Sequence, residues 1–159
     1  MSISSQHHTQ DRSQSKDYVT VYINDQLFGI PVLQVQDIVR THSITPIPLA
    51  PPEIAGSLNL RGRIVTAIDV RQRLGLPSDV KQRKKLMNIV IETKGELYSL
   101  LVDKLGEVLS LPDDKYEKNP ATLEECWREI SAGIYRLEGS LLIVMNVNAL
   151  LDFSRKLVA

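Results

Sequence analysis

Few side chains in this 159-residue sequence have the types and spacing that catalysis or metal binding requires. His7 and His8 are adjacent and could hold a metal ion, but a lone histidine pair in a polar tail is a weak site. The third histidine, His42, has no marked nucleophile or acid to act with. Cys126, the only cysteine, precedes Trp127 and is more typical of a small core residue than of a nucleophile. These residues predict neither a catalytic triad nor a metal site.

The carboxylates are the remaining candidates for acid–base chemistry. Asp69 stands before a helical pattern, where a side-chain oxygen commonly accepts from free backbone N–H groups, so we expect an N-cap rather than a general base. Asp103 and Glu107 are four residues apart, but exposed carboxylates at this spacing are usually solvated. No CxxC, HExxH or Walker motif occurs. We expect no enzyme and no cofactor, with a weak hydrolase that uses Asp69 or Asp103 as the alternative.

The composition narrows the class of protein further. Lys+Arg and Asp+Glu are 19 each, so no net charge favours nucleic acid or an anionic membrane, and aromatic residues at 5% are few for base stacking. One cysteine permits no intrachain disulfide, which fits a reducing compartment. Residues 1–16 are polar and lack the apolar core of a signal peptide, and no apolar run is long enough to span a membrane. The sequence predicts a cytoplasmic protein with a disordered arm over residues 1–16.

The residues after the arm show the patterns of short strands. Apolar and polar side chains alternate over residues 18–32 around a turn-like segment at 24–26, which predicts a hairpin. Residues 33–39 fit either a short helix or a strand. Residues 43–52 contain four prolines and predict an extended connector, and the basic run at 79–85 predicts a solvated linker.

The chain contains an internal duplication. With an offset of 70 residues, the matched pairs include Val19 with Ile89, Val21 with Ile91, Phe28 with Tyr98, Asp37 with Glu107 and Ile38 with Val108. With an offset of 77 they include Gly56 with Gly133, Arg61 with Glu138, Gly62 with Gly139 and Asp69 with Asn146. Two copies cannot form a solenoid, so we expect a two-lobed molecule with a pseudo-twofold relation. The longer offset places extra chain between Val108 and Gly133.

Each half predicts a hairpin, a connector, a strand, a glycine turn, a strand and a short helix. Short strands at this spacing indicate a mainly β fold of two small barrels. Gly62 and Gly139 fall where two strands must reverse. Asp69 and Asn146 precede the two helical patterns and are good N-caps.

Three segments resemble the CheW family of bacterial chemotaxis adaptors: 29–38 (GIPVLQVQDI), 56–71 (GSLNLRGRIVTAIDVR) and 139–151 (GSLLIVMNVNALL). The resemblance covers residues 17–153. It implies a single domain of two intertwined lobes, with repeats at about 18–76 and 86–153, and a tail at 154–159. Each lobe would be a five-stranded SH3- or OB-like β-barrel with short helices, and elements would be exchanged between the lobes.

The resemblance also implies what the protein does. A CheW-like adaptor is non-catalytic and couples the cytoplasmic tips of methyl-accepting chemoreceptors to the regulatory domain of the histidine kinase CheA. Such a protein is cytoplasmic, is associated with receptor arrays at the inner membrane, and is compatible with rings that include further CheW copies. The alternatives are a small barrel module that binds nucleic acid, and an adaptor in a kinase pathway other than motility.

The predicted partner-binding residues are not assigned to kinase or receptor; they are Val35, Asp37, Gly56, Leu60, Arg61, Gly62 and Val108. Val35, Leu60 and Val108 could anchor a receptor helix in an apolar groove between the lobes, with plain core as the alternative. For Gly56 we expect a tight turn that does not tolerate Asp.

Arg61 is predicted to form an ion pair with Asp37 that fixes the wall of this groove, with an exposed, unpaired arginine as the alternative. The second repeat has Glu138 and Glu107 at these positions, so the fold does not require the pair. The sequence departs from the family pattern in two places: Thr66 stands where proline is common, and Asp37 stands where glutamate is common. The Asp37 side chain is shorter than that of glutamate, so it reaches less far toward a partner.

Overall fold

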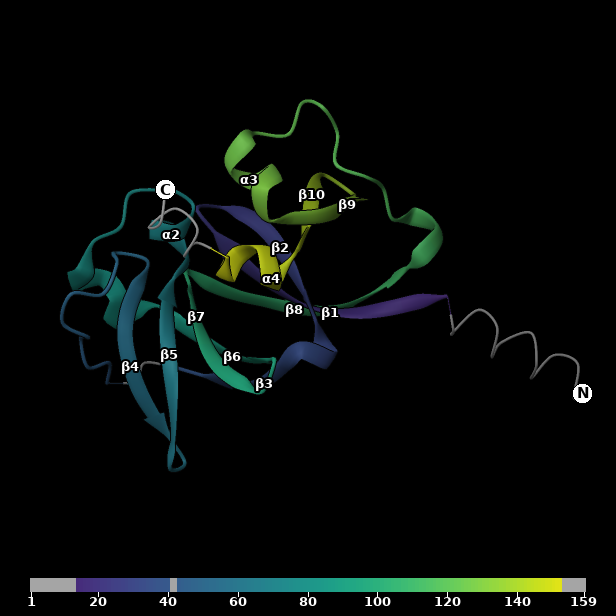
Figure 1. Ribbon diagram of the computed structural model, residues 1–159. Helices are drawn as coiled ribbons and strands as arrows, with labels where there is room; N and C mark the ends of the chain where they lie inside the picture. The colour runs from purple at the N-terminus through teal and green to yellow at the C-terminus, as the bar shows by residue number, and fades with distance from the viewer. Residues whose placement is uncertain (1–13, 41–42, 153–159) are drawn as a thin grey trace, which may run out of the picture.

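The computed structural model describes residues 14–40 and 43–152 (Figure 1). The first strand begins at Ser15, inside the segment 1–16 that the sequence assigned to an arm. The remainder of that arm up to residue 13, His7, His8, His42 and the tail at 154–159 lie outside the described residues.

Strands make up most of the described chain. They are β1 (Ser15–Ile23), β2 (Gln26–Pro31), β3 (Val35–Val39), β4 (Ile54–Leu60), β5 (Arg63–Asp69), β6 (Met87–Thr93), β7 (Glu96–Val102), β8 (Lys104–Pro112), β9 (Ser131–Leu137) and β10 (Ser140–Met145). The helical segments are short: η1 (Val32–Gln34), α2 (Val70–Arg73), η2 (Val80–Lys85), η3 (Asp113–Lys115), α3 (Glu125–Ile130) and α4 (Val147–Leu151). Residues 33–39, which fit either a short helix or a strand from the sequence, thus contain a helical turn followed by a strand.

The strands form two five-stranded sheets, and each sheet draws on both repeats. Sheet I has the order β8-β1-β2-β10-β9, and sheet II has the order β3-β6-β7-β5-β4. Figure 1 shows the exchange by colour, because the purple β1–β2 hairpin lies among the green and yellow strands of the second repeat. The pattern of each half predicts a barrel of its own, but neither repeat builds a sheet by itself. The strand orders instead show strands exchanged between the repeats.

The two sheets have the same topology, which confirms the duplication. Replacing each strand of sheet I by its repeat partner reproduces the order of sheet II, and both contain one parallel pair, β2 with β10 and β7 with β5. The irregularities recur as well. Pairing slips at residue 55 between β4 and β5 and at the equivalent residue 132 between β9 and β10.

The space between the two sheets is filled by the largest core. Alternating side chains of both exchanged hairpins point into it, among them Val21, Phe28, Ile89 and Leu100, together with residues of α2, α3 and α4. Period-2 alternation sends the other side chains of the same strands to smaller cores, one for each sheet. Each sheet forms one lobe, and the seam between the two lobes is mainly packed core. A partner can therefore enter the seam only where this packing leaves room.

Local signals in the sequence explain the short helices and turns. Asp69 and Asn146 are N-caps, as predicted, and accept from the backbone amides of Gln72 and Ala149. Gly62 (φ +83°) follows Arg61 (φ +52°) in the turn between β4 and β5, where positive φ is required, and the Asn59 side chain accepts from its amide.

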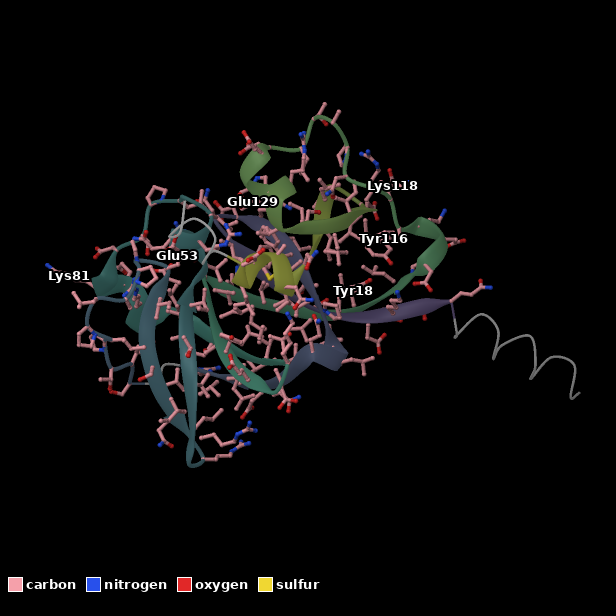
Figure 2. The ribbon with its side chains drawn as sticks, viewed as in Figure 1. Tyr18, Glu53, Lys81, Tyr116, Lys118 and Glu129 are labelled. Carbon is pink, nitrogen blue, oxygen red and sulfur yellow. The ribbon has the colours of Figure 1, made fainter. Side chains whose placement is uncertain are left out.

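The extra chain of the second repeat forms η3, α3 and the segment between them. Trp127 of α3 is buried and packs edge-on against Phe28, with ring centroids 5.3 Å apart. The side chain of its neighbour Cys126 lies outside the described part of the structure. Figure 2 shows Glu129, on the same helix, near α4. Helix α3 adds Trp127 and Ile130 to the central core, and the equivalent segment of the first repeat forms no helix.

Candidate partner-binding site

The predicted ion pair between Asp37 and Arg61 forms. Arg61 Nη2 lies 3.1 Å from Asp37 Oδ2, and the Asp37 side chain is 24% exposed while that of Arg61 is 79% exposed. Asp37 is on β3, one edge of sheet II, and Arg61 is in the turn that leaves β4, the opposite edge. The pair therefore links the two edges of one sheet, and it can hold β3 in position at the surface.

Sheet I has no equivalent of this pair among the described residues. The repeat partners Glu107 and Glu138 carry like charges, and both are exposed. Sheet I instead has an ion pair between Arg136 and Glu117, at 3.0 Å, that joins β9 to the segment after η3. The Asp37–Arg61 pair is thus found in one lobe only, so the shared fold does not require it.

Gly56 has a structural role that differs from the predicted one. It lies within strand β4, buried, and not in a tight turn. Its φ is +147°, and a Cβ built on it would lie 2.8 Å from both Ile44 Cγ2 and the carbonyl carbon of Thr45. The connector that contains Thr45 pairs with Ser57 at this point. Glycine is required here because the connector backbone approaches the strand closely.

The aliphatic candidates divide into packed and exposed residues. Val35 is half-buried against the central core, and Leu60 is half-buried against the core of sheet II. Val108 is 62% exposed on β8, the edge strand of sheet I, where it pairs with Val19. Among the predicted residues, those at the surface are therefore Arg61, Gly62 and Val108, with Asp37 partly exposed.

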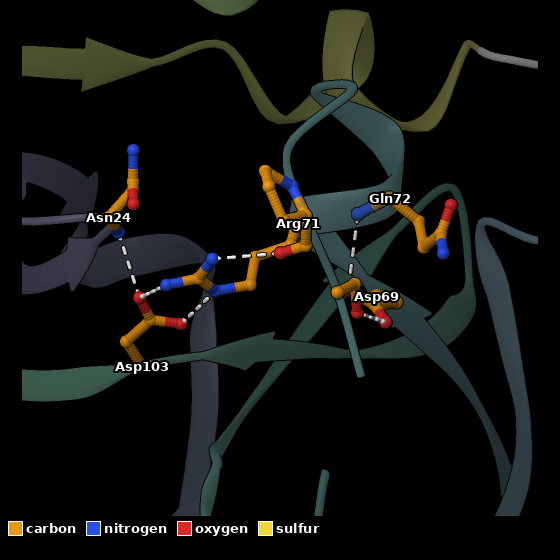
Figure 3. Close-up of polar contacts among 7 residues, drawn as sticks. Asn24, Asp69, Arg71, Gln72 and Asp103 are labelled. Carbon is orange, nitrogen blue, oxygen red and sulfur yellow. Dashed lines mark hydrogen bonds and ion pairs between the residues drawn. The ribbon is translucent and has the colours of Figure 1, made fainter. Parts of the chain in front are cut away.

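A second ion pair, between Arg71 and Asp103, lies where the two sheets meet. Arg71 at the start of α2 donates from Nε to Asp103 Oδ1 at 2.8 Å and from Nη2 to Oδ2 at 2.6 Å (Figure 3). The amide of Asn24, in the β1–β2 turn of sheet I, also donates to Asp103 Oδ2 at 2.8 Å. Burial acts to raise the pKa of Asp103, but the hydrogen bonds from Arg71 and Asn24 outweigh it and the pKa is lowered. Asp103 is thus occupied as an inter-lobe anchor.

Asp69, the other carboxylate considered for hydrolysis, also has structural partners. Besides capping α2, its Oδ2 accepts from Ser78 Oγ at 2.6 Å and from Arg83 Nε at 3.0 Å. Arg83 belongs to the basic run 79–85, which was predicted to be a solvated linker. This prediction is wrong in part, because residues 80–85 form the helical turn η2 and the Arg83 side chain is only 17% exposed.

A cavity of about 680 Å³ opens where edge strand β3 of sheet II meets the start of β8 of sheet I; we call it the seam cavity. Its apolar lining consists of Ile38, Leu86, Met87 and Leu105. Its charged lining consists of Arg40, Lys85, Asp103 and Lys104. None of the seven predicted residues lines it, although Asp37 is the chain neighbour of Ile38. The sequence did not predict these residues as a partner site, although Asp103 was considered as an acid–base group. The only local signal was the basic run that ends at Lys85.

Over residues 14–40 and 43–152, no group of three or more histidine, cysteine or carboxylate side chains is placed to hold a metal ion. Within the same ranges no helix is long and apolar enough to cross a membrane.

Comparison with known proteins places this architecture in a family. The sequence matches the model of the CheW-like domain over residues 17–155, which includes both repeats. The chain belongs to the CheW-like family. It is 28% identical to the scaffolding protein TtCheW from Thermoanaerobacter tengcongensis, whose crystal structure it matches with a TM-score of 0.76 over 86% of this chain and 92% of that one. The CheW-like resemblance of the sequence is thereby confirmed.

Curated CheW proteins are similar over nearly their whole length. The chemotaxis protein CheW of Bacillus subtilis (strain 168) is 27% identical over 135 residues, which are 84% of this chain and 85% of that protein. The chemotaxis protein CheW of Rhizobium meliloti (strain 1021) is 25% identical over 134 residues, covering 84% and 86%. The similarity therefore extends over both lobes and the seam between them.

Proposed function

We propose that this protein is a non-catalytic adaptor of chemotaxis signalling that couples methyl-accepting chemoreceptors to the histidine kinase CheA. The observation that carries the proposal is the match to the CheW-like domain over both repeats, 17–155, together with the similarity to a CheW scaffold structure. Scaffold function depends on surfaces rather than reactive groups, and both carboxylates considered for catalysis are engaged in structural contacts.

The proposed receptor-binding surface is β3 with the seam cavity beside it. Ile38 is 37% exposed and Leu105 is half-buried at this place, so the cavity offers apolar contacts of the kind that accept side chains from a helix. The Asp37–Arg61 pair anchors the outer side of β3 to the β4–β5 turn. Val108, the repeat partner of Ile38, gives sheet I an exposed aliphatic residue on its own edge strand, where a second partner could pack.

Binding to both partners tests the proposal. Calorimetric titrations of the purified protein with a chemoreceptor signalling tip and with a CheA regulatory domain should each give a defined affinity. Size-exclusion chromatography with light scattering should then show one complex that contains all three components. The adaptor function would be disproved if neither partner bound, or if each partner excluded the other.

The ion pair offers a test within the protein. Arg61→Ala should weaken binding of at least one partner while the protein stays folded. Arg136→Ala, which removes an ion pair with an exposed arginine from the other lobe, is the matched control and should leave both affinities unchanged. Equal affinities for wild type and Arg61→Ala would remove the pair from the proposed site.

A further inference from the structure

The charged side chains of the seam cavity are the feature that the proposed function leaves unexplained. Arg40, Lys85 and Lys104 line the cavity and are exposed, and none of them lies within 4.0 Å of a carboxylate of the described residues. The six ion pairs among described residues all use other cations, namely Arg61, Arg63, Arg71, Arg73, Arg83 and Arg136. The cavity therefore holds three cations that are not paired by any carboxylate within residues 14–40 and 43–152.

The single carboxylate of the cavity does not neutralise them. Asp103 accepts two hydrogen bonds from Arg71 and one from the Asn24 amide, so its charge is already balanced by a guanidinium. Lys104 is held over the ring of Tyr22, with Nζ 5.4 Å from the ring centroid, a contact that positions the ammonium group without cancelling its charge. The net charge around the cavity is positive in a protein with no net charge overall.

The internal duplication provides a control for this positive charge. At the offset of 70 residues, the repeat partners of Lys85, Lys104 and Arg40 are Ser15, Gln34 and Ser110, respectively. None of these partners is charged. A cavity of about 490 Å³ exists at the equivalent place in sheet I, and its lining includes Ser15, Lys16, Asp17 and Leu33. That lining carries one charge of each sign. The fold therefore forms the cavity with or without an excess of positive charge, and that excess is present in one copy only.

We propose that the seam cavity selects a helical segment that is acidic as well as apolar. The apolar side chains of the segment would pack against Ile38 and Leu105, and its carboxylates would pair with Arg40, Lys85 and Lys104. The inference rests on the proposed function, since the occupant is the receptor tip. It adds the recognition rule, which is that acidic residues flanking the apolar contact determine which receptors this adaptor accepts.

The test compares two double charge reversals by calorimetry, with a receptor signalling tip that carries glutamates as the probe. Lys85→Glu with Lys104→Glu should weaken binding of the tip at least about tenfold. Lys115→Glu with Lys118→Glu makes the same change in charge at exposed lysines outside the cavity, and should alter binding less than about twofold. Figure 2 shows Lys118 beside Tyr116, on the segment that follows β8. Thermal unfolding of each variant checks that it remains folded.

Two further measurements identify the chemistry of the occupant. Replacing the glutamates of the tip by glutamine should reproduce the loss, and combining it with the Lys85 and Lys104 reversals should add little. Raising the salt concentration should weaken wild-type binding more than binding by the reversed variant. Equal binding by wild type and the cavity variant would overturn the inference and leave the adaptor function intact.

The remaining outcomes are also decisive. If the wild type bound neither the tip nor the kinase domain, the proposed function would fail and the inference with it. If a single-stranded oligonucleotide bound in a way that depended on Lys85 and Lys104, while the tip did not, the cavity would be a phosphate site and the acidic-helix inference would be wrong.

Discussion

Replacing Gly56 by alanine should destabilise the protein strongly, although the added group is one methyl. Gly56 has φ +147°, and its new Cβ would lie 2.8 Å from Ile44 Cγ2 and from the carbonyl carbon of Thr45. One of these contacts is backbone, which cannot rotate away. The connector at 43–52 would have to leave strand β4, and with it the pairing of Thr45 with Ser57.

The magnitude follows from two costs. An unfavourable backbone conformation costs about 1–3 kcal/mol, and overpacking a buried site costs about 1–3 kcal/mol more. The free energy of unfolding should therefore fall by about 2–6 kcal/mol in Gly56→Ala, against a total of about 5–15 kcal/mol for a domain. Gly62→Ala is the matched control: its φ is +83°, but nothing lies within 4 Å of the added Cβ. It should cost only about 1–2 kcal/mol.

Urea unfolding followed by the fluorescence of Trp127, the only tryptophan, measures both variants. The expected result is a clearly lower urea midpoint for Gly56→Ala than for Gly62→Ala, with the same m-value for both variants. If Gly56→Ala cost no more than Gly62→Ala, the close approach of the connector to β4 would be incorrect. Gly56 would then return to the candidates for direct partner contact.

Three further predictions concern charged side chains. Arg61→Ala should lower the free energy of unfolding by less than about 1 kcal/mol, because the side chain is 79% exposed, so denaturation curves close to wild type are expected even where partner binding is lost. Arg73 is buried and donates to the carbonyls of Ala149 and Leu150; Arg73→Met should cost about 2–4 kcal/mol in urea unfolding, and a cost below about 1 kcal/mol would contradict the described contacts. Folding lowers the pKa of Asp103. Its ion pair therefore contributes fully to the free energy of unfolding above the unfolded-state pKa of about 4, and this contribution is lost as pH falls through the folded-state pKa. Wild type should therefore lose more stability than Asp103→Asn as pH falls below about 4, and parallel curves would show that the pair contributes nothing.

The parts of the fold that could be predicted are those with local or repeated signals. The offsets of 70 and 77 predicted the equivalence of the strands, and the N-caps at Asp69 and Asn146 followed from a side chain placed just before a helical pattern. The Asp37–Arg61 pair was predictable for a similar reason: the repeat showed which charges the fold does not need.

The remainder depends on contacts between residues distant in sequence. The parallel pairing of β2 with β10 has no local signature, so the residues alone suggested a separate barrel from each half. The role of Gly56 depends on Thr45, which reaches it only through the path of the connector. Arg71 and Asp103 are 32 residues apart, and no pattern in either segment identifies the partner.

The positive charge of the seam cavity was hidden for the same reason. Arg40, Lys85 and Lys104 come from three segments, and the sequence as a whole is neutral. Only the folded chain places them around one cavity. The basic run at 79–85 drew attention to that segment but gave no sign that Arg83 would turn inward while Lys85 would stay at the surface.

NMR titration tests most directly the proposal that the receptor binds at the junction of β3 and β8. A ¹⁵N-labelled sample titrated with an unlabelled receptor tip should show its largest amide shifts at Ile38, Arg40, Lys104 and Leu105, with small shifts across β9 and α3. Shifts concentrated on β9 and α3, with the amides of the seam cavity unchanged, would place the receptor elsewhere and rule out the seam cavity as its site.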